Sequence, residues 1–327
     1  MTVLVISSKR DAHVTWVTDH FDRIGHPWVR INTEDFATNI SLSVDPSSGN
    51  GSLAIKDSGR KLDLAAVKSV WYRKPDPLEL SHFELDQAGL DYIEGEFTEV
   101  IQGIYALLHG ALWINNPLTT RLTHRKLFQL NTASLLGLRT PRTLVSNIEA
   151  DVLEFAQALP GDLAIKSLSS LSVISRTPET TLQYGLFTRR LTKQELLSIS
   201  SNIPHMPTVY QEYVEKLYEL RVTMVGDKSF ACKIESQDTE FGKDDFRIDT
   251  HSARHSRYEL PDEIVEKLKA YMAAMQINFG CFDIIRSTDG EYCFIECNVN
   301  GQWLWVEKQI DAGIAVALSE LLLSAAH

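Results

Sequence analysis

The sequence predicts a mixed fold of three units, α/β at its start and α+β in its later parts. Apolar strand-like segments alternate with amphipathic helical ones over the first 115 residues, Pro117 breaks the chain, and strand-like segments dominate beyond residue 204. The 327 residues, 44% of them hydrophobic, suffice for two or three packed units. We therefore expect an N-terminal unit at 1–116, a smaller central unit at 117–203 and a C-terminal unit at 204–327.

The N-terminal unit is predicted to be α/β. Gly25 can end its first helix, and the dense turn at residues 45–51 indicates a hairpin. The expected strands are Val3–Ser7, Val29–Asn32, Ile40–Val44, Ser52–Lys56 and Val67–Tyr72, and the expected helices are Ala12–Ile24 and Phe83–His109.

The other two units are predicted to be α+β. The central unit is expected to contain a helix at Thr123–Leu136, strands at Leu163–Lys166 and Leu186–Leu191, and a serine-rich loop at Ser167–Ser175. The C-terminal unit is expected to contain strands at Val209–Val214, Leu220–Val225, Phe230–Glu235, Phe282–Ser287 and Tyr292–Asn298, with helices at Pro261–Asn278 and Asp311–Ala325.

Charge and hydropathy narrow the class of partner. The formal net charge is -11, which disfavours nucleic acid because phosphate binding needs a basic face. Mean hydropathy is -0.13, no apolar run reaches the roughly 18 residues of a membrane span, and the first residues resemble a strand rather than a signal peptide. The four cysteines lack the close spacing of a zinc site and are expected to be buried thiols. We expect a cytoplasmic protein with no membrane or nucleic-acid partner.

Three oxygen-bearing side chains mark a predicted hairpin near the C-terminus. Glu296 and Asn298 are two residues apart and therefore share a face of one strand, and Asp283 on the preceding strand can lie opposite them. Mg²⁺ prefers carboxylate and amide oxygens and completes its shell with water and phosphate oxygens. The alternative is three polar residues on an exposed sheet face. The apolar neighbours weaken it, because charges in a buried sheet need partners or a metal.

This hairpin resembles the metal-binding end of the ATP-grasp ligases, and further steps of that family follow in its order from about residue 117 to 327. The resemblance implies two phosphate-binding lysines, a hinge whose backbone meets adenine, an acid on the ribose, and arginines that stabilise the γ-phosphate and an acyl phosphate. The implied nucleotide-binding residues are Lys126, Lys166, Ser167, Gln211, Glu212, Tyr213, Val214 and Glu219; the implied catalytic residues are Arg221 and Arg247; the implied magnesium ligands are Asp283, Glu296 and Asn298. The implied cofactors are ATP and Mg²⁺.

Two departures from the common family pattern point to a subgroup. The phosphate flap has no glycine between residues 167 and 172, and the ending at 300–307 is NGQWLWVE. Together with VWYRKP at 70–75, this ending resembles the graspetide synthetases, which include the microviridin ligases. The resemblance implies an ATP-grasp fold with a Rossmann-like N-terminal domain. It also implies a ribosomal precursor peptide, with leader and core, whose Asp or Glu side chains are joined to Ser/Thr hydroxyls or Lys amines. A homodimer is compatible with it.

Three residues are candidates for contact with the peptide substrate. Trp303 and Trp305 could form an aromatic wall that excludes water from the acyl phosphate, or could pack in the core under the last helix. Arg73 could contact the peptide or lie on the surface. Two other functions stay open: an ATP-grasp ligase that adds an amino acid to a protein tail or small acid, and a non-catalytic nucleotide- or peptide-binding module.

Overall fold

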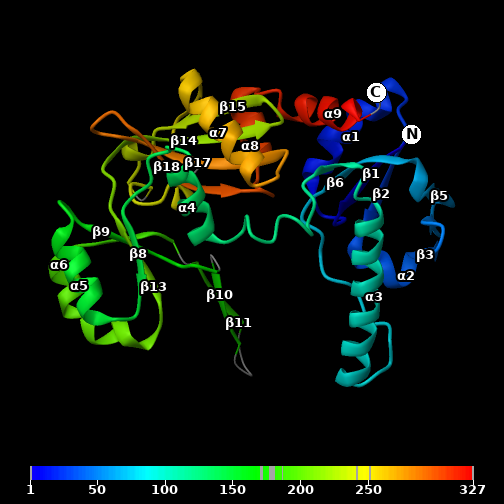
Figure 1. Cartoon of the computed structure of the whole chain (residues 1–327), viewed down its shortest axis with the longest axis horizontal. Coiled ribbons are helices and arrows are strands. Elements are labelled where there is room, and N and C mark those ends of the chain that lie inside the picture. The colour runs from blue at the N-terminus through cyan, green and yellow to red at the C-terminus, as the bar shows by residue number, and fades with distance from the viewer. Residues whose placement is uncertain are drawn as a thin grey trace.

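The computed structural model describes residues 2–169, 172–176, 181–185, 187–240, 242–249 and 252–325. Within these ranges the strands form five sheets. Figure 1 shows two halves side by side, one built around β1, β2, β6 and the long helix α3, the other around the central and C-terminal sheets. A mixed α/β fold was predicted, and it is confirmed.

The N-terminal half is built on a parallel sheet. Its strands, in pairing order, are β2 (Trp28–Asn32), β1 (Thr2–Ser7), β6 (Val67–Tyr72) and β7 (Leu112–Ile114). Residues 3–7 are all buried, as expected of a central strand covered on both faces. Helix α1 (Ala12–Ile24) begins after Asp11, whose side chain accepts a hydrogen bond from the His13 N–H, and ends at Gly25 in the left-handed region at φ 67°.

A second sheet and two helices complete this half. Strands β3 (Ile40–Asp45), β4 (Asn50–Ile55) and β5 (Arg60–Asp63) form an antiparallel sheet that follows the short helix α2 (Phe36–Asn39). The hairpin was predicted. The third strand was not, and it forms because the chain reverses again at Gly59, where φ is 65°. Helix α3 (Gln87–Leu107) is shorter than predicted. It begins after Asp86, whose side chain accepts a hydrogen bond from the Gly89 N–H and so caps the helix.

The central sheet lies in the other half. Its order is β12 (Arg189–Leu191), β9 (Leu163–Lys166), β13 (Thr208–Glu212) and β8 (Thr143–Ser146), and it is accompanied by helices α5 (Glu149–Ala158) and α6 (Lys193–Ser198). Strand β13 lies beyond residue 203, so this sheet crosses the expected boundary at 203/204. The chain leaves the sheet at residues 213–215.

Two expectations for the central unit are wrong. The serine-rich loop does not extend to Ser175, because β10 (Ser172–Arg176) pairs with β11 (Thr181–Gly185) in a separate antiparallel sheet. Residues 170 and 171 of that loop lie outside the described residues. The strand expected at Leu186–Leu191 begins at Arg189, because β12 pairs with only three residues of β9, and Leu186 also lies outside the description.

The C-terminal sheet is antiparallel, in the order β16 (His255–Tyr258), β15 (Lys228–Ile234), β14 (Lys216–Val225), β17 (Phe279–Ser287) and β18 (Tyr292–Asn298). Helices α4 (Lys126–Leu135) and α7 (Asp262–Ala274) share its apolar core. Helix α4 starts later than predicted, at Lys126 after Arg125, and Thr123 donates its hydroxyl to the Thr120 carbonyl in the turn before it.

One core joins the two halves of the molecule. Helices α8 (Leu304–Ile310) and α9 (Ile314–Ser324) follow the C-terminal sheet, and α9 lies beside α1 (Figure 1). Phe21 and Val5 from the N-terminal half share a buried cluster with Phe279 and Leu318 from the C-terminal half. The two halves therefore cannot separate without exposing this apolar surface.

Only α9 was predicted as a helix; α8 was not, because the alternation at residues 302–305 resembles a strand. No helix within the described ranges has the length and apolar character that crossing a bilayer requires.

A buried carboxylate fixes the junction between α8 and α9. Glu307 is 7% exposed and accepts hydrogen bonds from the Gly313 N–H at 3.2 Å and the Ile314 N–H at 2.7 Å. We expect Glu307→Ala to lower the free energy of unfolding by about 1–3 kcal/mol, because the two N–H groups at the start of α9 lose their acceptor. Urea unfolding measures this. Glu320→Ala, on the exposed face of α9, is the control; an equal effect of both changes would contradict the capping role.

Candidate active site

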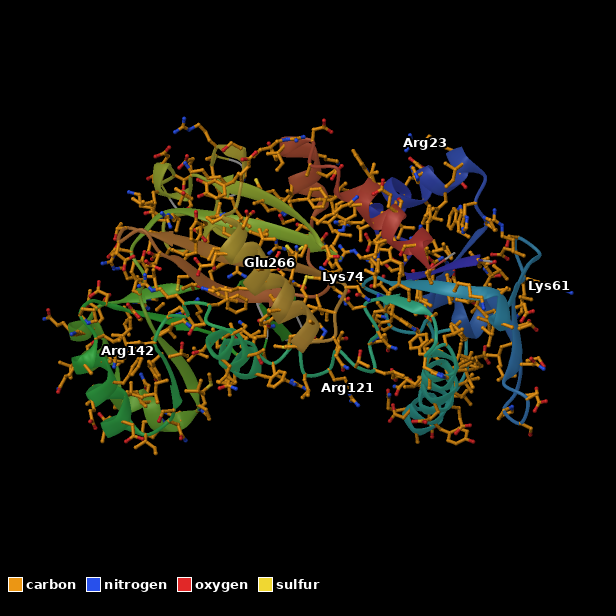
Figure 2. The ribbon with its side chains drawn as sticks, turned by 45° about the horizontal axis from the view of Figure 1, so that its top comes forward. Arg23, Lys61, Lys74, Arg121, Arg142 and Glu266 are labelled. Atoms are coloured by element: carbon orange, nitrogen blue, oxygen red, sulfur yellow. The ribbon has the colours of Figure 1, made fainter. Side chains whose placement is uncertain are left out.

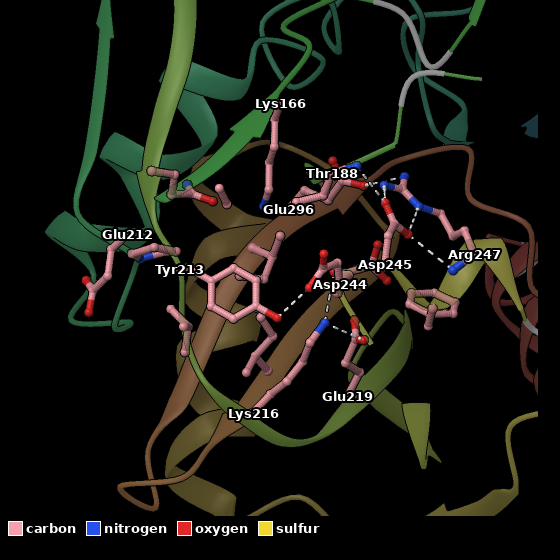
Figure 3. Close-up of a pocket in the computed structure, with 18 of the residues that line it drawn as sticks. Lys166, Thr188, Glu212, Tyr213, Lys216, Glu219, Asp244, Asp245, Arg247 and Glu296 are labelled. Carbon is pink, nitrogen blue, oxygen red and sulfur yellow. Dashed lines mark hydrogen bonds and ion pairs between the residues drawn. The ribbon is translucent and has the colours of Figure 1, made fainter. Parts of the chain in front are cut away.

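The main cleft lies between the central and C-terminal sheets and has a volume of about 780 Å³. Strand β9 and residues 211–214 form one wall, and β14, β17, β18 and the loop at 244–247 form the other. Figure 3 shows charged side chains from both walls converging on it. The predicted residues that line it are Lys126, Lys166, Ser167, Gln211, Glu212, Tyr213, Val214, Glu219, Arg247, Asp283 and Glu296. Arg221 lies directly behind, bonded to Asp283.

Two lysines face the carboxylate of Glu296. Lys166 is the last residue of β9 and points across the cleft towards Glu296 (Figure 3). Burial lowers its pKa to about 8, because the surrounding protein desolvates the ammonium group. Lys126, the first residue of α4, donates to the Ser167 carbonyl at 2.7 Å and lies 3.9 Å from a Glu296 oxygen. The two ammonium groups lie near one shared carboxylate, Glu296, whose negative charge balances only one of them. This arrangement favours a polyanionic ligand.

Arg247 is held in position by a bidentate ion pair. Asp245 accepts from its Nε at 2.7 Å and its Nη2 at 2.5 Å, and a terminal nitrogen of Arg247 lies 3.7 Å from Glu296. Burial alone would lower the pKa of Arg247, but the Asp245 carboxylate outweighs it and the net shift is upward. Asp245 also accepts the Thr188 N–H at 3.1 Å, so the segment preceding β12 is tied to this loop. The guanidinium is therefore charged and fixed at the edge of the cleft.

Glu219 lies at the far end of the cleft. Burial raises the pKa of its carboxyl group. It accepts hydrogen bonds from Lys216 Nζ at 2.8 Å and Ser236 Oγ at 2.9 Å. The sequence did not predict a role for Lys216. A bulge between Lys216 and Tyr218 brings Lys216 and Glu219 into contact, and no sequence pattern indicated that bulge.

The chain crosses from β13 to β14 at the back of the cleft. The Tyr213 N–H donates to the Asp162 carbonyl at 3.0 Å, and its hydroxyl donates to Asp244 at 2.7 Å. Gln211 is buried, and its amide donates to Thr143 Oγ1. Among the described residues, none accepts a hydrogen bond from the Val214 N–H. A free backbone donor beside apolar walls is what a planar base such as adenine can use.

The carboxylate pair of the predicted metal site is brought together. Asp283 and Glu296 are directly opposed across β17 and β18, and both line the cleft. Asn298 lies opposite Cys281, further along β18; its side chain is exposed and accepts the Asn300 N–H at 3.0 Å. The described ranges contain no cluster of three or more His, Cys, Asp or Glu side chains suited to a metal. Two carboxylates beside an amide oxygen nevertheless fit Mg²⁺, which takes its remaining ligands from water and phosphate.

The two motifs that pointed to the graspetide subgroup touch each other. Arg73, in VWYRKP, is 1% exposed and donates to the Asn300 carbonyl and, at 3.1 Å, to Gln302 Oε1, both in NGQW. Its Nε lies 3.2 Å from an Asp11 oxygen. With these partners inside the protein, Arg73 supports the 300–302 loop instead of forming part of the exposed surface.

That loop in turn supports the carboxylate pair. Arg221 donates to Asp283 at 2.7 Å and to the Gln302 carbonyl at 3.1 Å. Gly301 permits the close approach, since a Cβ there would lie 2.4 Å from Cys281 Cβ and 2.8 Å from Arg221 Nη2. A chain of contacts therefore runs from Asp11 through Arg73 to Arg221.

The tryptophans of the motif occupy different environments. Trp303 is fully buried and packs edge-on against His13 with ring centroids 5.0 Å apart, so the core-packing interpretation describes it. Trp305 is partly buried between Phe246 and His255, at 6.4 and 5.3 Å. Because α8 begins at Leu304, the two rings do not alternate on one strand face.

Comparisons with known proteins agree with this architecture. Residues 2–121 match the model of the MvdD pre-ATP grasp domain. No curated protein matches. Many solved structures are similar to this chain, and three of them illustrate similarity over almost its whole length. The macrocyclase MdnC from Microcystis aeruginosa MRC, bound with precursor peptide MdnA, has a TM-score of 0.83 and 27% identity, with 99% of this chain and 100% of that chain covered.

The second structure is a RiPP-associated ATP-grasp ligase from Chryseobacterium gregarium, in complex with ADP and a leader and core peptide. It has a TM-score of 0.87 and 25% identity and covers 99% and 96% of the two chains. The third, macrocyclase MdnB from Microcystis aeruginosa MRC, has a TM-score of 0.77 and 27% identity and covers 98% of both. The fold and its cleft define an ATP-grasp ligase, an ATP-dependent, ADP-forming enzyme. Within that class, the match of the N-terminal residues and the similarity to these three structures support a graspetide-type synthetase.

Nucleotide binding should depend on pH through Lys166. Its pKa of about 8 in the free protein means that the ammonium is charged below pH 8 and neutral above it. Phosphate oxygens favour the charged form, so we expect affinity for MgADP to be full below pH 8 and to fall as pH rises towards 9.5. Isothermal titration at several pH values measures this. Lys166→Arg should flatten the profile, and an identical fall in that variant would contradict the assignment.

Gly301 should tolerate no side chain. We expect Gly301→Ala to displace the 300–302 loop and to lower kcat by at least about tenfold, because Arg221 and Cys281 occupy the space that a Cβ needs. ADP formation measures the rate. Gly110→Ala, where a Cβ meets nothing within 4 Å, is the matched control. A Gly301→Ala enzyme with unchanged kcat would show that the loop does not position Arg221.

Proposed function

We propose that this chain is an ATP-dependent macrocyclising ligase that acts on a ribosomal precursor peptide. It phosphorylates Asp or Glu side chains of the core, and Ser/Thr hydroxyls or Lys amines then displace the phosphate to give ω-ester or ω-amide crosslinks. The observation that carries the proposal is one cleft in which Lys166 and Arg247 face the opposed pair Asp283 and Glu296, on a chain similar over 99% of its length to a macrocyclase bound with its precursor peptide.

The charged residues suggest a division of labour. Lys126 and Lys166 neutralise the α- and β-phosphates, while the backbone at 212–214 holds adenine and Glu219 holds the ribose. Arg221 and Arg247 stabilise charge on the transferred phosphoryl group and the acyl phosphate. Asp283, Glu296 and Asn298 would hold Mg²⁺, which would supply positive charge to offset that of the phosphates. Phosphoryl transfer needs positioning and charge neutralisation, and these residues supply both.

The partner of the chain and its division into units follow from the same function. A peptide with leader and core is the substrate, in line with the peptide complexes of two of the similar proteins. We propose a cytoplasmic enzyme, compatible with a homodimer, with no nucleic-acid or membrane partner. We also propose three units, with the second boundary moved from 203/204 to the hinge at 213–215, because β13 pairs within the central sheet.

The direct test is a reaction with the precursor peptide encoded beside the enzyme. Incubation with ATP and Mg²⁺ should lower the peptide mass by one water for each crosslink, with ADP released in step, as mass spectrometry and a coupled assay can measure. A gain of one amino-acid residue would instead identify a ligase that extends a protein tail or small acid. ADP release with no peptide product would also overturn the proposal.

The carboxylate pair should be needed for chemistry and not for peptide binding. We expect Glu296→Gln and Asp283→Asn to lower ADP formation by at least about a hundredfold, because the metal loses a charged ligand. Peptide affinity, measured by fluorescence anisotropy, should change by less than about twofold. Glu291→Gln, exposed on the same hairpin, is the control. Equal loss of peptide affinity in the pair variants would contradict this division of labour.

A further inference from the structure

A second cavity lies in the N-terminal half, with a volume of about 850 Å³ and no lining residue in common with the main cleft. Its walls are the end of β6 and the loop after it, one face of α3, and the segment at 117–121. We call it the α3 pocket and define it by Tyr72, Glu94, Tyr105, Leu118 and Arg121. Nothing in the proposed chemistry uses it.

The floor of the α3 pocket is aromatic. Tyr72 and Tyr105 meet edge-to-face with centroids 5.9 Å apart, and Trp113 packs behind Tyr105 at 5.7 Å. Tyr105 is only 7% exposed, and it lines the pocket. Its hydroxyl is therefore available to a ligand that enters there.

The charge of α3 and of the segments that flank it is strongly one-sided, although the pocket lining itself contains Arg121 beside Asp76 and Glu94. Residues 75–120 contain eight Asp or Glu and no Lys or Arg, in a chain whose net charge is -11. Asp76 is paired with Arg10, but in the part of the chain that the structure describes no carboxylate of α3 is in an ion pair. Glu94 brings this charge to the pocket, and Arg121 faces it from another wall. The surface therefore favours a cationic partner.

The pocket is also adjacent, along the chain, to a residue that supports the active site. Tyr72 lines it, while the next residue, Arg73, holds the 300–302 loop. Figure 2 shows Lys74 and Arg121 between the two halves of the molecule, and Figure 1 shows α3 and the β10–β11 pair extending on the same side. A long, flexible substrate that reaches the main cleft from that side can reach the α3 pocket as well.

We propose that the α3 pocket binds a Lys- or Arg-containing segment of the substrate peptide. The aliphatic part of the basic side chain lies on Tyr72 and Tyr105, and its charged end meets Glu94 and the Tyr105 hydroxyl. Aromatic faces and a carboxylate together bind such side chains through apolar contact, cation–π attraction and charge. Arg121 is suited to a backbone carbonyl or a neighbouring acid of the same segment. This inference rests on the proposed function, because it assigns the pocket to the same peptide.

The first test is binding of a defined probe and needs no turnover. The probe is a fluorescein-labelled octapeptide of alternating Lys and Leu, titrated with the full-length protein and followed by anisotropy, and an alternating Glu and Leu peptide is the comparison. We expect Glu94→Lys to weaken binding of the basic probe about fivefold or more, and Tyr105→Phe about twofold to threefold. The matched control is Glu96→Lys, an exposed charge reversal on the same helix outside the pocket, which should change binding by less than about twofold.

Equal weakening by Glu94→Lys and Glu96→Lys would mean that the probe senses only the net charge of α3, and that would overturn the proposal. So would unchanged binding in Glu94→Lys, or equal affinity for the acidic probe. This titration still gives an answer if no peptide is ever dehydrated, so failure of the proposed function and failure of the pocket are distinguishable.

The second test uses whichever precursor peptide the enzyme dehydrates. We expect Glu94→Lys to raise KM for that peptide about fivefold or more and to leave kcat and KM for ATP within about twofold, because the pocket holds substrate away from the reacting atoms. A fall in kcat with unchanged KM would contradict a docking role. Replacing the basic residues of the peptide by Gln should reproduce the rise in KM, and that replacement should add nothing further in the Glu94→Lys enzyme.

Discussion

The ion pair between Arg221 and Asp283 is the interaction on which the active-site architecture depends. It joins the neighbouring strands β14 and β17, with 2.7 Å between Arg221 Nη1 and Asp283 Oδ1, and both side chains are almost wholly shielded from solvent. A buried pair of this kind is costly unless its remaining hydrogen-bonding groups are satisfied. The Gln302 carbonyl accepts a hydrogen bond from a second nitrogen of the Arg221 guanidinium. Arg73 in turn donates to the side chain of Gln302 and so fixes the loop that contains this carbonyl. The N-terminal half thereby contributes to the geometry of a site in the other half.

This dependence explains why the two halves share a core. Arg73 comes from β6 of the N-terminal sheet, and the loop that it holds comes after β18 of the C-terminal sheet. A guanidinium can keep such contacts only if both sheets are fixed to each other. The apolar cluster that contains Phe21, Phe279 and Leu318 provides this rigidity. The α3 pocket begins one residue before Arg73, at Tyr72.

The electrostatics of the cleft are arranged for a ligand that the protein does not supply. Lys166 is desolvated enough to lower its pKa, and Lys126 and Arg247 lie beside the same carboxylate. Asp245 compensates Arg247, so Glu296 faces the two lysines. Phosphate oxygens with a divalent ion would satisfy both signs of charge at once. Glu219 differs from these lysines, because its partners belong to the protein. Hydrogen bonds from Lys216 and Ser236 offset the cost of burying its carboxylate and hold it in place without a ligand.

Local patterns were sufficient for much of this molecule. Strand patterns indicated β17 and β18 and allowed Asp283 to lie opposite Glu296. Strand-like runs indicated β1, β6 and β9, and helical spacing indicated α1. The order of the charged residues along the chain resembled that of the ATP-grasp ligases, and this resemblance indicated the class. The strands and helices depend on neighbours in sequence, so the sequence by itself determined them.

Other features depend on segments that meet only in three dimensions. The contact of Arg73 with Gln302 spans 229 residues, and Gly301 matters because of Cys281 and Arg221 rather than because of a turn. The bulge that brings Lys216 to Glu219, the burial of Trp303 and the position of Tyr105 on the α3 pocket are of the same kind. The tertiary structure decided these, because burial and hydrogen-bond partners are properties of packed surfaces, and residue types and their spacing do not specify which surfaces pack together.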